Sequence, residues 1–181
     1  MGLRFITRRF SSLGWASWSN FVADENYNIK GYTSPYYAAR MINVEWVQHR
    51  SGVHRMFSST TDIKDDAGNA LVTSYAVPRP DGNWSLMLVN CDENNPHPVR
   101  IAFTGADDRQ ISFSGPVTFV TFGTEQYVWM NDGPNSHPDP DNPPAAKTIS
   151  ATAETVFTLP KASVSVLRGK VDGLPQENAV R

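Results

Sequence analysis

The spacing of apolar residues changes once along the chain, close to Gly52. Before it, from Tyr36 to about Gln48, apolar side chains recur at steps of three and four residues, the period of a helix with one buried face. Ser34 is the predicted N-cap, and Pro35 suits the first helical position because its missing N–H would have no helical partner. We expect this amphipathic helix to end at Ser51 and Gly52. Its expected buried face consists of Tyr37, Ala38, Met41, Ile42 and Val44.

After Gly52, short runs of β-branched and aromatic residues with a period of two alternate with turn-forming residues, which is typical of strands. The predicted strands are His54–Thr60, Ala70–Val77, Trp84–Asn90, Val99–Thr104, Gln110–Phe113, Val117–Phe122, Gln126–Met130, Lys147–Ala151, Thr155–Leu159 and Ser163–Arg168. The segment Pro80-Asp81-Gly82-Asn83 predicts a tight turn, so that the strands on either side of it form one hairpin. The pattern therefore predicts an all-β fold: an antiparallel, jelly-roll-like β-sandwich with one N-terminal amphipathic helix.

Three parts of the chain are expected. Residues 1–48 form an irregular segment plus the helix, residues 49–171 the sandwich, and residues 172–181 a disordered tail. The first 33 residues show neither period, yet they carry too much apolar surface for a solvated tail. Those side chains are Trp15, Trp18, Phe21, Tyr27 and Tyr32. Asn131–Ala146, with five Pro and three Asp, is expected to be a long, extended polar loop.

Composition excludes several classes of function. At 181 residues the chain suits one domain, and its net charge of −2 with no basic run beyond Arg8-Arg9 argues against a nucleic-acid partner. No apolar run approaches the roughly 20 residues that cross a bilayer, so no membrane is expected. One cysteine, Cys91, allows no internal disulfide. The start is basic, but Phe10–Trp18 is too broken by Ser and Gly for a signal peptide. We expect a fragment start inside a longer reading frame, and the compartment stays unknown.

No catalytic residue is predicted. Glycoside hydrolysis uses two facing carboxyl groups, and no acidic residue here follows a buried strand in an Asn-Glu pair. The acids considered are Asp24, Glu25, Glu45, Asp92, Glu93, Glu125 and Glu154, with Glu45 expected to be solvated or to pack the helix. The histidines, His49, His54, His97 and His137, are scattered, so we interpret them as surface or capping residues, with a zinc or copper site as the alternative.

No cofactor is expected, with structural calcium as the alternative. Asp62, Asp65 and Asp66 could supply oxygen ligands, although they lack the EF-hand order and a hairpin turn explains them better. For carbohydrate, the candidates are Tyr127, Trp129 and Trp84. Tyr127 and Trp129 stand two apart in one strand, and Trp84 begins a strand beside a turn. All three could instead belong to the sandwich core.

The order of features from Tyr32 onward resembles a known domain. The features are the helix Ser34–Trp46, then Leu71–Val77, then Pro80–Asn90 with its Asp-Gly-Asn-Trp and Leu-Met-Leu-Val-Asn, and finally Phe157–Leu167 with Thr-Leu-Pro and Ser-Val-Ser-Val-Leu. About 130 residues resemble the C-terminal β-sandwich of retaining (β/α)₈-barrel glycoside hydrolases of families 39, 51, 30 and 79. The resemblance implies that residues 1–48 are the end of a barrel. Because the acid/base and nucleophile of those enzymes lie on the barrel, it carries no catalytic role onto this chain.

Three hypotheses follow. The leading one is a non-catalytic accessory module, structural or weakly carbohydrate-binding, whose partners are a polysaccharide or a catalytic barrel and whose parent enzyme is secreted or periplasmic. The alternative is a freestanding carbohydrate-active enzyme, a polysaccharide hydrolase or a metal-dependent one, with its site on the sandwich face. The third is a structural sandwich that forms a homodimer through its aromatic N-terminal segment.

Overall fold

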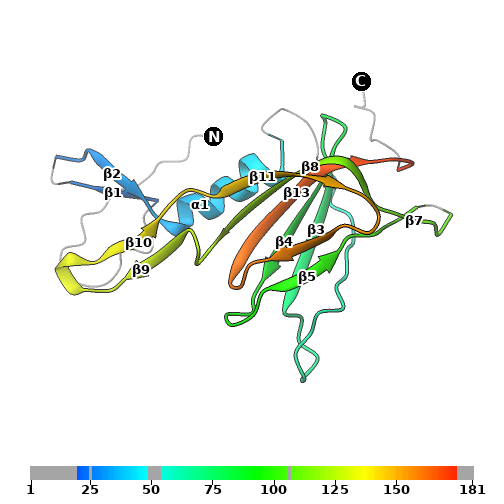
Figure 1. The fold of residues 1–181 in the computed structure, drawn as a ribbon. Helices are drawn as coiled ribbons and strands as arrows, with labels where there is room; N and C mark the ends of the chain where they lie inside the picture. The colour runs from blue at the N-terminus through cyan, green and yellow to red at the C-terminus, as the bar shows by residue number, and fades with distance from the viewer. Residues whose placement is uncertain (1–19, 25, 49–53, 106, 175–181) are drawn as a thin grey trace.

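The framework of the protein is one five-stranded antiparallel sheet (Figure 1). The computed structural model describes residues 20–24, 26–48, 54–105 and 107–174. In spatial order the strands are β11 (Ala145–Ala151), β8 (Phe113–Gly123), β13 (Ser163–Val171), β4 (Trp84–Asn90) and β3 (Val72–Pro78). Each pairs with its neighbour in antiparallel register, which confirms the predicted all-β, antiparallel fold.

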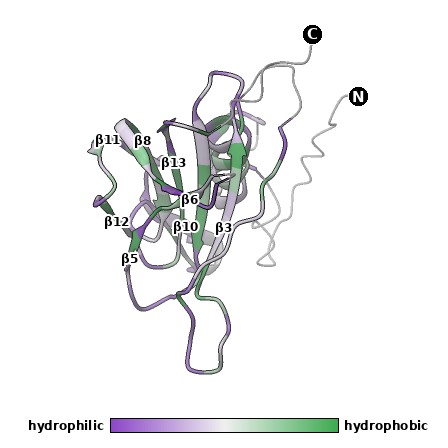
Figure 2. Cartoon of the chain, turned by 90° about the vertical axis from the view of Figure 1, so that its right-hand side faces the viewer, coloured by the Kyte–Doolittle hydropathy of each residue, from purple (hydrophilic) through white to green (hydrophobic). Residues whose placement is uncertain are grey.

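Short strand pairs cover one face of this sheet, which we call the inner face. β5 (His97–Arg100) pairs with β12 (Val156–Leu159), and β6 (Phe103–Thr104) pairs with β7 (Gln110–Ile111). Alternate residues of the large sheet point toward them and form the main apolar core, whose fully buried members include Val117, Leu159 and Leu167. Green, hydrophobic segments lie along strands of the large sheet in Figure 2. Because the second layer consists of separate pairs, the sandwich is not closed.

The outer face of the sheet is covered by the helix. α1 (Ser34–Arg40) continues directly into a π-helical segment, η2 (Met41–Trp46), where Val47 N donates to Ile42 O over five residues. Tyr37 and Met41 pack on Val120 and Val166 of the sheet. Among the described residues, no helix is long and apolar enough to span a membrane.

The predicted details of this helix need correction. Thr33, not Ser34, occupies the N-cap, and its side chain makes no capping hydrogen bond. The buried face is Tyr37, Met41 and Glu45, whereas Ala38, Ile42 and Val44 are exposed. The predicted apolar stripe is displaced because the last turn meets charged side chains on the sheet, and a carboxylate fits them better than Val44 does.

Two hairpins form an arm that extends from the sheet beyond the start of α1 (Figure 1). β1 (Phe21–Ala23) pairs with β2 (Ile29–Tyr32), and β9 (Tyr127–Met130) pairs with β10 (His137–Asp141) across the 3₁₀ turn η3 (Gly133–Asn135). No strand was predicted for β1, β2 or β10, which is wrong, whereas β9 confirms the predicted strand Gln126–Met130 to within one residue. In β10 the X-Pro steps already favour extended backbone, so pairing with β9 needs little rearrangement.

Other strands have bounds that differ from the predicted ones. Instead of forming a strand, His54–Thr60 makes one bridge, Phe57 with Ala76. The predicted strand Val99–Thr104 is divided between β5 and β6, and Gln110–Phe113 between β7 and β8. The hairpin at Pro80–Asn83 is confirmed: Arg79 N donates to Asn83 O at 2.8 Å, and Gly82 has the positive φ of 76° that its turn requires. Trp15, Trp18 and the tail from 175 lie outside the described residues.

Candidate functional site

The three aromatic residues predicted to bind carbohydrate do not share a surface. Trp84 is 5% exposed and belongs to the inner core, where its ring contacts Phe103 edge-on. Tyr127 is 8% exposed and lies beneath the helix beside Tyr37. Trp129, 37% exposed, lies farther along the arm and keeps an accessible ring. Of the three, only Trp129 can present a ring face to a sugar in this conformation.

The acidic residues considered for calcium lie in a long connection before β3. Asp65 Oδ1 accepts hydrogen bonds from the backbone N–H groups of Ala67 at 3.0 Å and Asn69 at 2.7 Å, which closes a turn. The Asn69 side chain and these N–H groups lower the pKa of Asp65. Within the described ranges, no group of three or more His, Cys, Asp or Glu side chains is placed to hold a metal ion. Asp65 therefore closes the turn, and calcium at Asp62, Asp65 and Asp66 stays a prediction.

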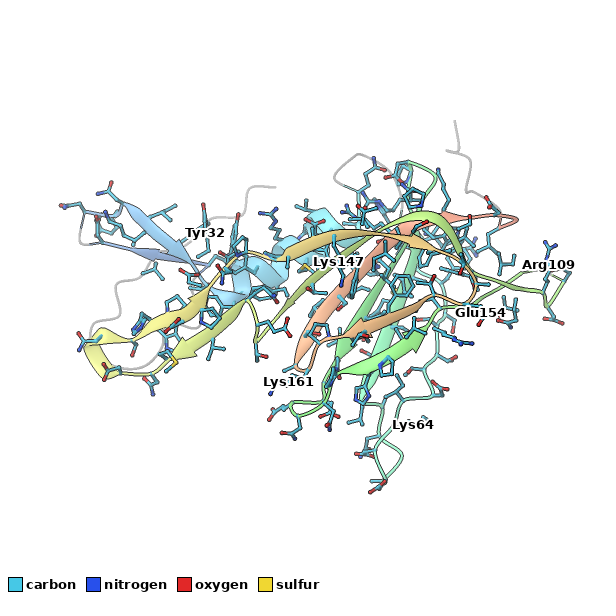
Figure 3. The ribbon with its side chains drawn as sticks, viewed as in Figure 1. Tyr32, Lys64, Arg109, Lys147, Glu154 and Lys161 are labelled. Carbon is cyan, nitrogen blue, oxygen red and sulfur yellow. The ribbon has the colours of Figure 1, made fainter. Side chains whose placement is uncertain are left out.

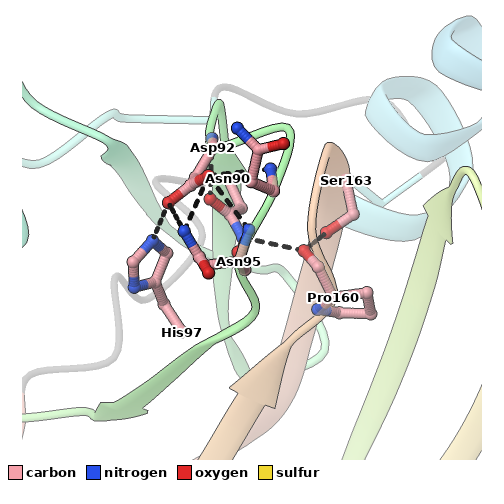
Figure 4. A network of polar contacts seen from close by, with 7 residues as sticks. Asn90, Asp92, Asn95, His97, Pro160 and Ser163 are labelled. Atoms are coloured by element: carbon pink, nitrogen blue, oxygen red, sulfur yellow. Dashed lines mark hydrogen bonds and ion pairs between the residues drawn. The ribbon is translucent and has the colours of Figure 1, made fainter.

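A second turn carboxylate, Asp92, organises the loop after β4 (Figure 4). It accepts hydrogen bonds from the backbone N–H groups of Asn94 and Asn95 and lies 3.0 Å from His97 Nε2. These contacts, the Asn94 N–H foremost, lower the pKa of Asp92 to about 2. Buried Asn90 extends the network by donating to Asn95 O and Pro160 O. The network joins the end of β4 to the turn between β12 and β13.

The described histidines serve separate local contacts. Gln48 N donates to His54 Nε2 at 3.1 Å, and His137 Nδ1 donates to Asn135 O at 2.8 Å. With His97 bound to Asp92, none of the three lies in a shared cluster of metal ligands. His49, one of the predicted close pair, lies outside the described residues.

The most connected polar site is the joint between the end of the helix and the outer face of the sheet. We define the joint as Arg40, Glu45, Arg79, Asp81 and Arg168. Glu45 Oε2 lies 2.9 Å from Arg168 Nη2, with both side chains largely buried, and Arg40 lies 3.8 Å from the other carboxylate oxygen. Because Arg168 stands on β13, the third of the five strands, this ion pair holds the helix over the middle of the sheet.

Arg79 completes the joint by binding the end of the helix. It follows β3 directly, and its Nη1 donates to Glu45 O at 2.9 Å and to Trp46 O at 3.2 Å. These carbonyls belong to the last turn, where helical partners are lacking, so a distant arginine serves as the C-terminal cap. Burial lowers the pKa of Arg79, while the carboxylate of Asp81, 3.3 Å away, acts in the opposite direction. Trp46 Nε1 adds a bond to Tyr75 O at 3.1 Å.

Of the residues of the joint, Glu45 alone was considered from the sequence, and it was expected either to be solvated or to pack the helix. The other four were not predicted. One signal was present: Arg168 interrupts the apolar run of β13 at a position where alternation places it on the outer face. Nothing in the spacing of Arg79, more than 30 residues from Glu45, indicates that the two meet.

An aromatic cluster fixes the other end of the helix to the arm. Tyr32 stacks on Tyr36 with ring centroids 4.2 Å apart, and Tyr37 contacts Phe122 at 4.9 Å. The backbone N–H of Ser34 donates to the Tyr127 hydroxyl, so a side chain from β9 caps the helix start. Burial, followed by the charge of Asp141, raises the pKa of both Tyr37 and Tyr127. The helix is thus held at both ends.

The arm itself exposes large apolar side chains. On the β1–β2 hairpin and its turn these are Val22, Tyr27, Ile29 and Tyr32, and on β9 they are Trp129 and Met130. We call these six residues the arm surface. Asp141 Oδ2 would lie 3.9 Å from a Cβ at Gly31, so the two hairpins lie against each other and carry the arm surface together. Large exposed apolar side chains on neighbouring strands are typical of contact surfaces.

Comparison with known proteins gives structural neighbours only. No protein-family model matches the chain, and no curated protein sequence matches it. The chain is similar to the family 51 α-L-arabinofuranosidase of Thermotoga petrophila RKU-1 over 57% of its length, with 16% identity and a TM-score of 0.38. It is similar to the family 51 arabinofuranosidase of Xanthomonas axonopodis pv. citri over 64%, with 15% identity and a TM-score of 0.37. It is similar to a bifunctional glucanase-xylanase from a metagenome library over 56% of its length, with 17% identity and a TM-score of 0.35.

The chain spans only 20%, 21% and 16% of the length of these three enzymes. With TM-scores below 0.5, the similarity assigns neither a topology nor an activity.

Proposed function

We propose that the chain is a non-catalytic accessory β-sandwich module of a glycoside hydrolase, and that its role is to hold an adjoining catalytic barrel in a set orientation. The observation that carries the proposal is the joint: a helix that precedes the sandwich is bonded to its outer face through Glu45, Arg79 and Arg168. The sequence resemblance supports the class, because in those enzymes the last barrel helix runs directly into the sandwich.

The packed face and the joint make the helix stiff relative to the sheet. A helix joined to a sheet only by a flexible linker transmits no orientation. Here Tyr37 and Met41 are buried against the sheet, and polar bonds fix the last turn, so rotation of the helix would break apolar and ionic contacts together. The arm surface then supplies the apolar area that a barrel would cover, since interfaces between domains of one chain combine such patches with a polar surround.

Hydrogen exchange of the isolated chain tests the joint. If the proposal holds, the amides of α1 and η2 exchange as slowly as those of the central strand β13, because the helix can open only when its buried side chains separate from the sheet. Met41→Ala should speed exchange of the helix while leaving β13 protected. The matched control is Ile42→Ala, an exposed position on the same helix. Rapid exchange of the helix in the unmodified chain would overturn the proposal.

An activity assay tests the non-catalytic part. We expect the purified chain to release no reducing sugar from arabinan, xylan or cellulose above a mock preparation from cells lacking the gene. Turnover that rises with protein concentration, with or without added metal ions, would favour the freestanding enzyme instead. Sedimentation equilibrium addresses the third hypothesis: a stable homodimer weakened by Tyr27→Ser on the arm surface would show that a second copy, and not a barrel, covers it.

A further inference from the structure

A shallow groove of about 230 Å³ lies at the open edge of the sandwich. Its residues come from β8, from the turn before β9, from the edge strand β11 and from the end of β12. They are Phe119, Thr121, Glu125, Gln126, Ala145, Ala146, Lys147, Thr158 and Pro160. The groove lies at the Ala145–Lys147 end of β11, where the inner face is exposed because β12 pairs with β5, whereas Ala151 at the other end of β11 is buried in the core.

Lys147 stands where a closed sandwich would have an apolar side chain. It pairs with Phe119 across β11 and β8, so the two side chains share the inner face. The Lys147 ammonium lies 5.2 Å from the centre of the Phe119 ring, a cation–π contact that holds the cation over the groove floor. The position of Lys147 on β11 can be followed in Figure 3. Among the described residues, no carboxylate pairs with this ammonium, which leaves its N–H donors available.

Glu125 supplies the opposite charge from a rigid turn. Gln126 N donates to Gly123 O at 2.9 Å, and Gly123 N donates to Gln126 Oε1 at 3.1 Å, so the turn is closed twice. A Cβ at Gly123 would lie 2.7 Å from Ser163 Cβ, so only glycine allows this approach to β13. Within the described chain the Glu125 carboxylate forms no ion pair or hydrogen bond, and it is therefore an available acceptor.

We propose that this groove is a subsite for one residue of a neutral saccharide chain. The formal charges of Lys147 and Glu125 cancel, so an anionic or cationic ligand would leave one of them opposed. Ammonium, carboxylate, amide and threonine hydroxyl groups together donate and accept, as a ring of sugar hydroxyls requires. The volume is below the roughly 300–1,000 Å³ of pockets for drug-sized ligands, which suits a single sugar ring. The site is separate from the joint, and only the choice of ligand class rests on the proposed function.

The test is a titration of the isotopically labelled chain with arabinohexaose, xylohexaose and cellohexaose, followed by amide chemical shifts. At least one hexasaccharide should shift the amides of β11 and of the turn 123–126 and leave those of the arm unchanged. Lys147→Met, which keeps the apolar stem, and Glu125→Gln should each weaken binding at least tenfold. The matched controls are Lys64→Met and Glu154→Gln, which are exposed and lie outside the groove (Figure 3); they should bind as the unmodified chain does.

Three results would overturn the inference. The first is that no hexasaccharide shifts any amide of the unmodified chain up to its solubility limit, or that variants with unchanged melting temperatures bind as tightly as the unmodified chain. The second is shifts confined to the arm around Trp129, which would place binding there. The third is tighter binding of oligogalacturonate, which would contradict a neutral ligand. None of them bears on hydrogen exchange at the joint, so the proposed function and this inference can fail separately.

Discussion

The two faces of the five-stranded sheet are covered by different chemistry. On the inner face the packed side chains are almost all apolar, among them Leu159, Leu167 and Phe157. On the outer face an aromatic cluster and a buried ion pair hold one helix. Apolar packing is non-directional and tolerates several arrangements of equal volume. The charged joint accepts one arrangement, because its hydrogen bonds need set distances and angles. The inner face therefore provides stability, and the outer face provides orientation.

The largest effect is expected on the inner face. Leu167 is 0% exposed at the centre of β13, and Leu167→Ala should lower the free energy of unfolding by about 3–4 kcal/mol through lost burial and a residual cavity. Urea denaturation followed by tryptophan fluorescence measures it. Exposed Val156→Ala is the control, with a change within about 0.5 kcal/mol. A loss below about 1 kcal/mol for Leu167→Ala would show that the inner face does not dominate.

The next effect is at the joint. Glu45→Gln leaves Arg168 without its partner, and we expect a loss of about 2 kcal/mol, less than for fully buried pairs because the side chains stay 12% and 22% exposed. The double variant Glu45→Met/Arg168→Met should recover most of this loss, since no buried charge remains. Its helix should nevertheless exchange amide hydrogens faster than in the unmodified chain. Full protection in the double variant would show that apolar packing alone sets the orientation.

A smaller effect is expected at the end of the sheet, where Asp92 closes its loop. Its folded pKa of about 2 lies below the ordinary value of 3.8. The charged carboxylate therefore stabilises the fold above about pH 4, and this contribution is lost as the pH falls toward 2. Asp92→Asn should be less stable at pH 7 and similar to the unmodified chain near pH 2. Stability curves that stay parallel between pH 2 and pH 5 would contradict this role.

The smallest effect on stability is expected on the arm surface. Trp129→Ala should change the free energy of unfolding by less than about 0.5 kcal/mol, because the ring is exposed and outside both packed clusters. If Trp129 is a sugar platform, the same change should abolish retention of the chain on insoluble xylan or cellulose. Trp84→Ala is the contrast: it removes a core ring and should cost about 3–5 kcal/mol. Unfolding by Trp129→Ala would place that ring in the core.

The local pattern determined the strands that carry the inner core. β4 was predicted with its observed bounds, and the turn at Pro80–Asn83 and the hairpin it closes were predicted from residue type. Alternation is enough to predict these strands, because one face of each strand packs on an apolar core. The sequence therefore shows a period of two, whichever strand lies opposite. The same holds for β12 and β13, whose predicted starts lie within one residue of those observed.

Only the tertiary structure decided the outer face and the arm. The helix was expected to bury Val44, yet the structure buries Glu45, because Arg168 lies opposite it on a strand more than 120 residues later in the chain. β9 was predicted as a strand, but its partner β10 could not be predicted because the prolines and polar residues of β10 carry no alternation, and β10 forms by pairing with β9. A local pattern records which side of an element is apolar. Which charge meets which, and where the sandwich stays open beside Lys147, depends on contacts between residues far apart in sequence.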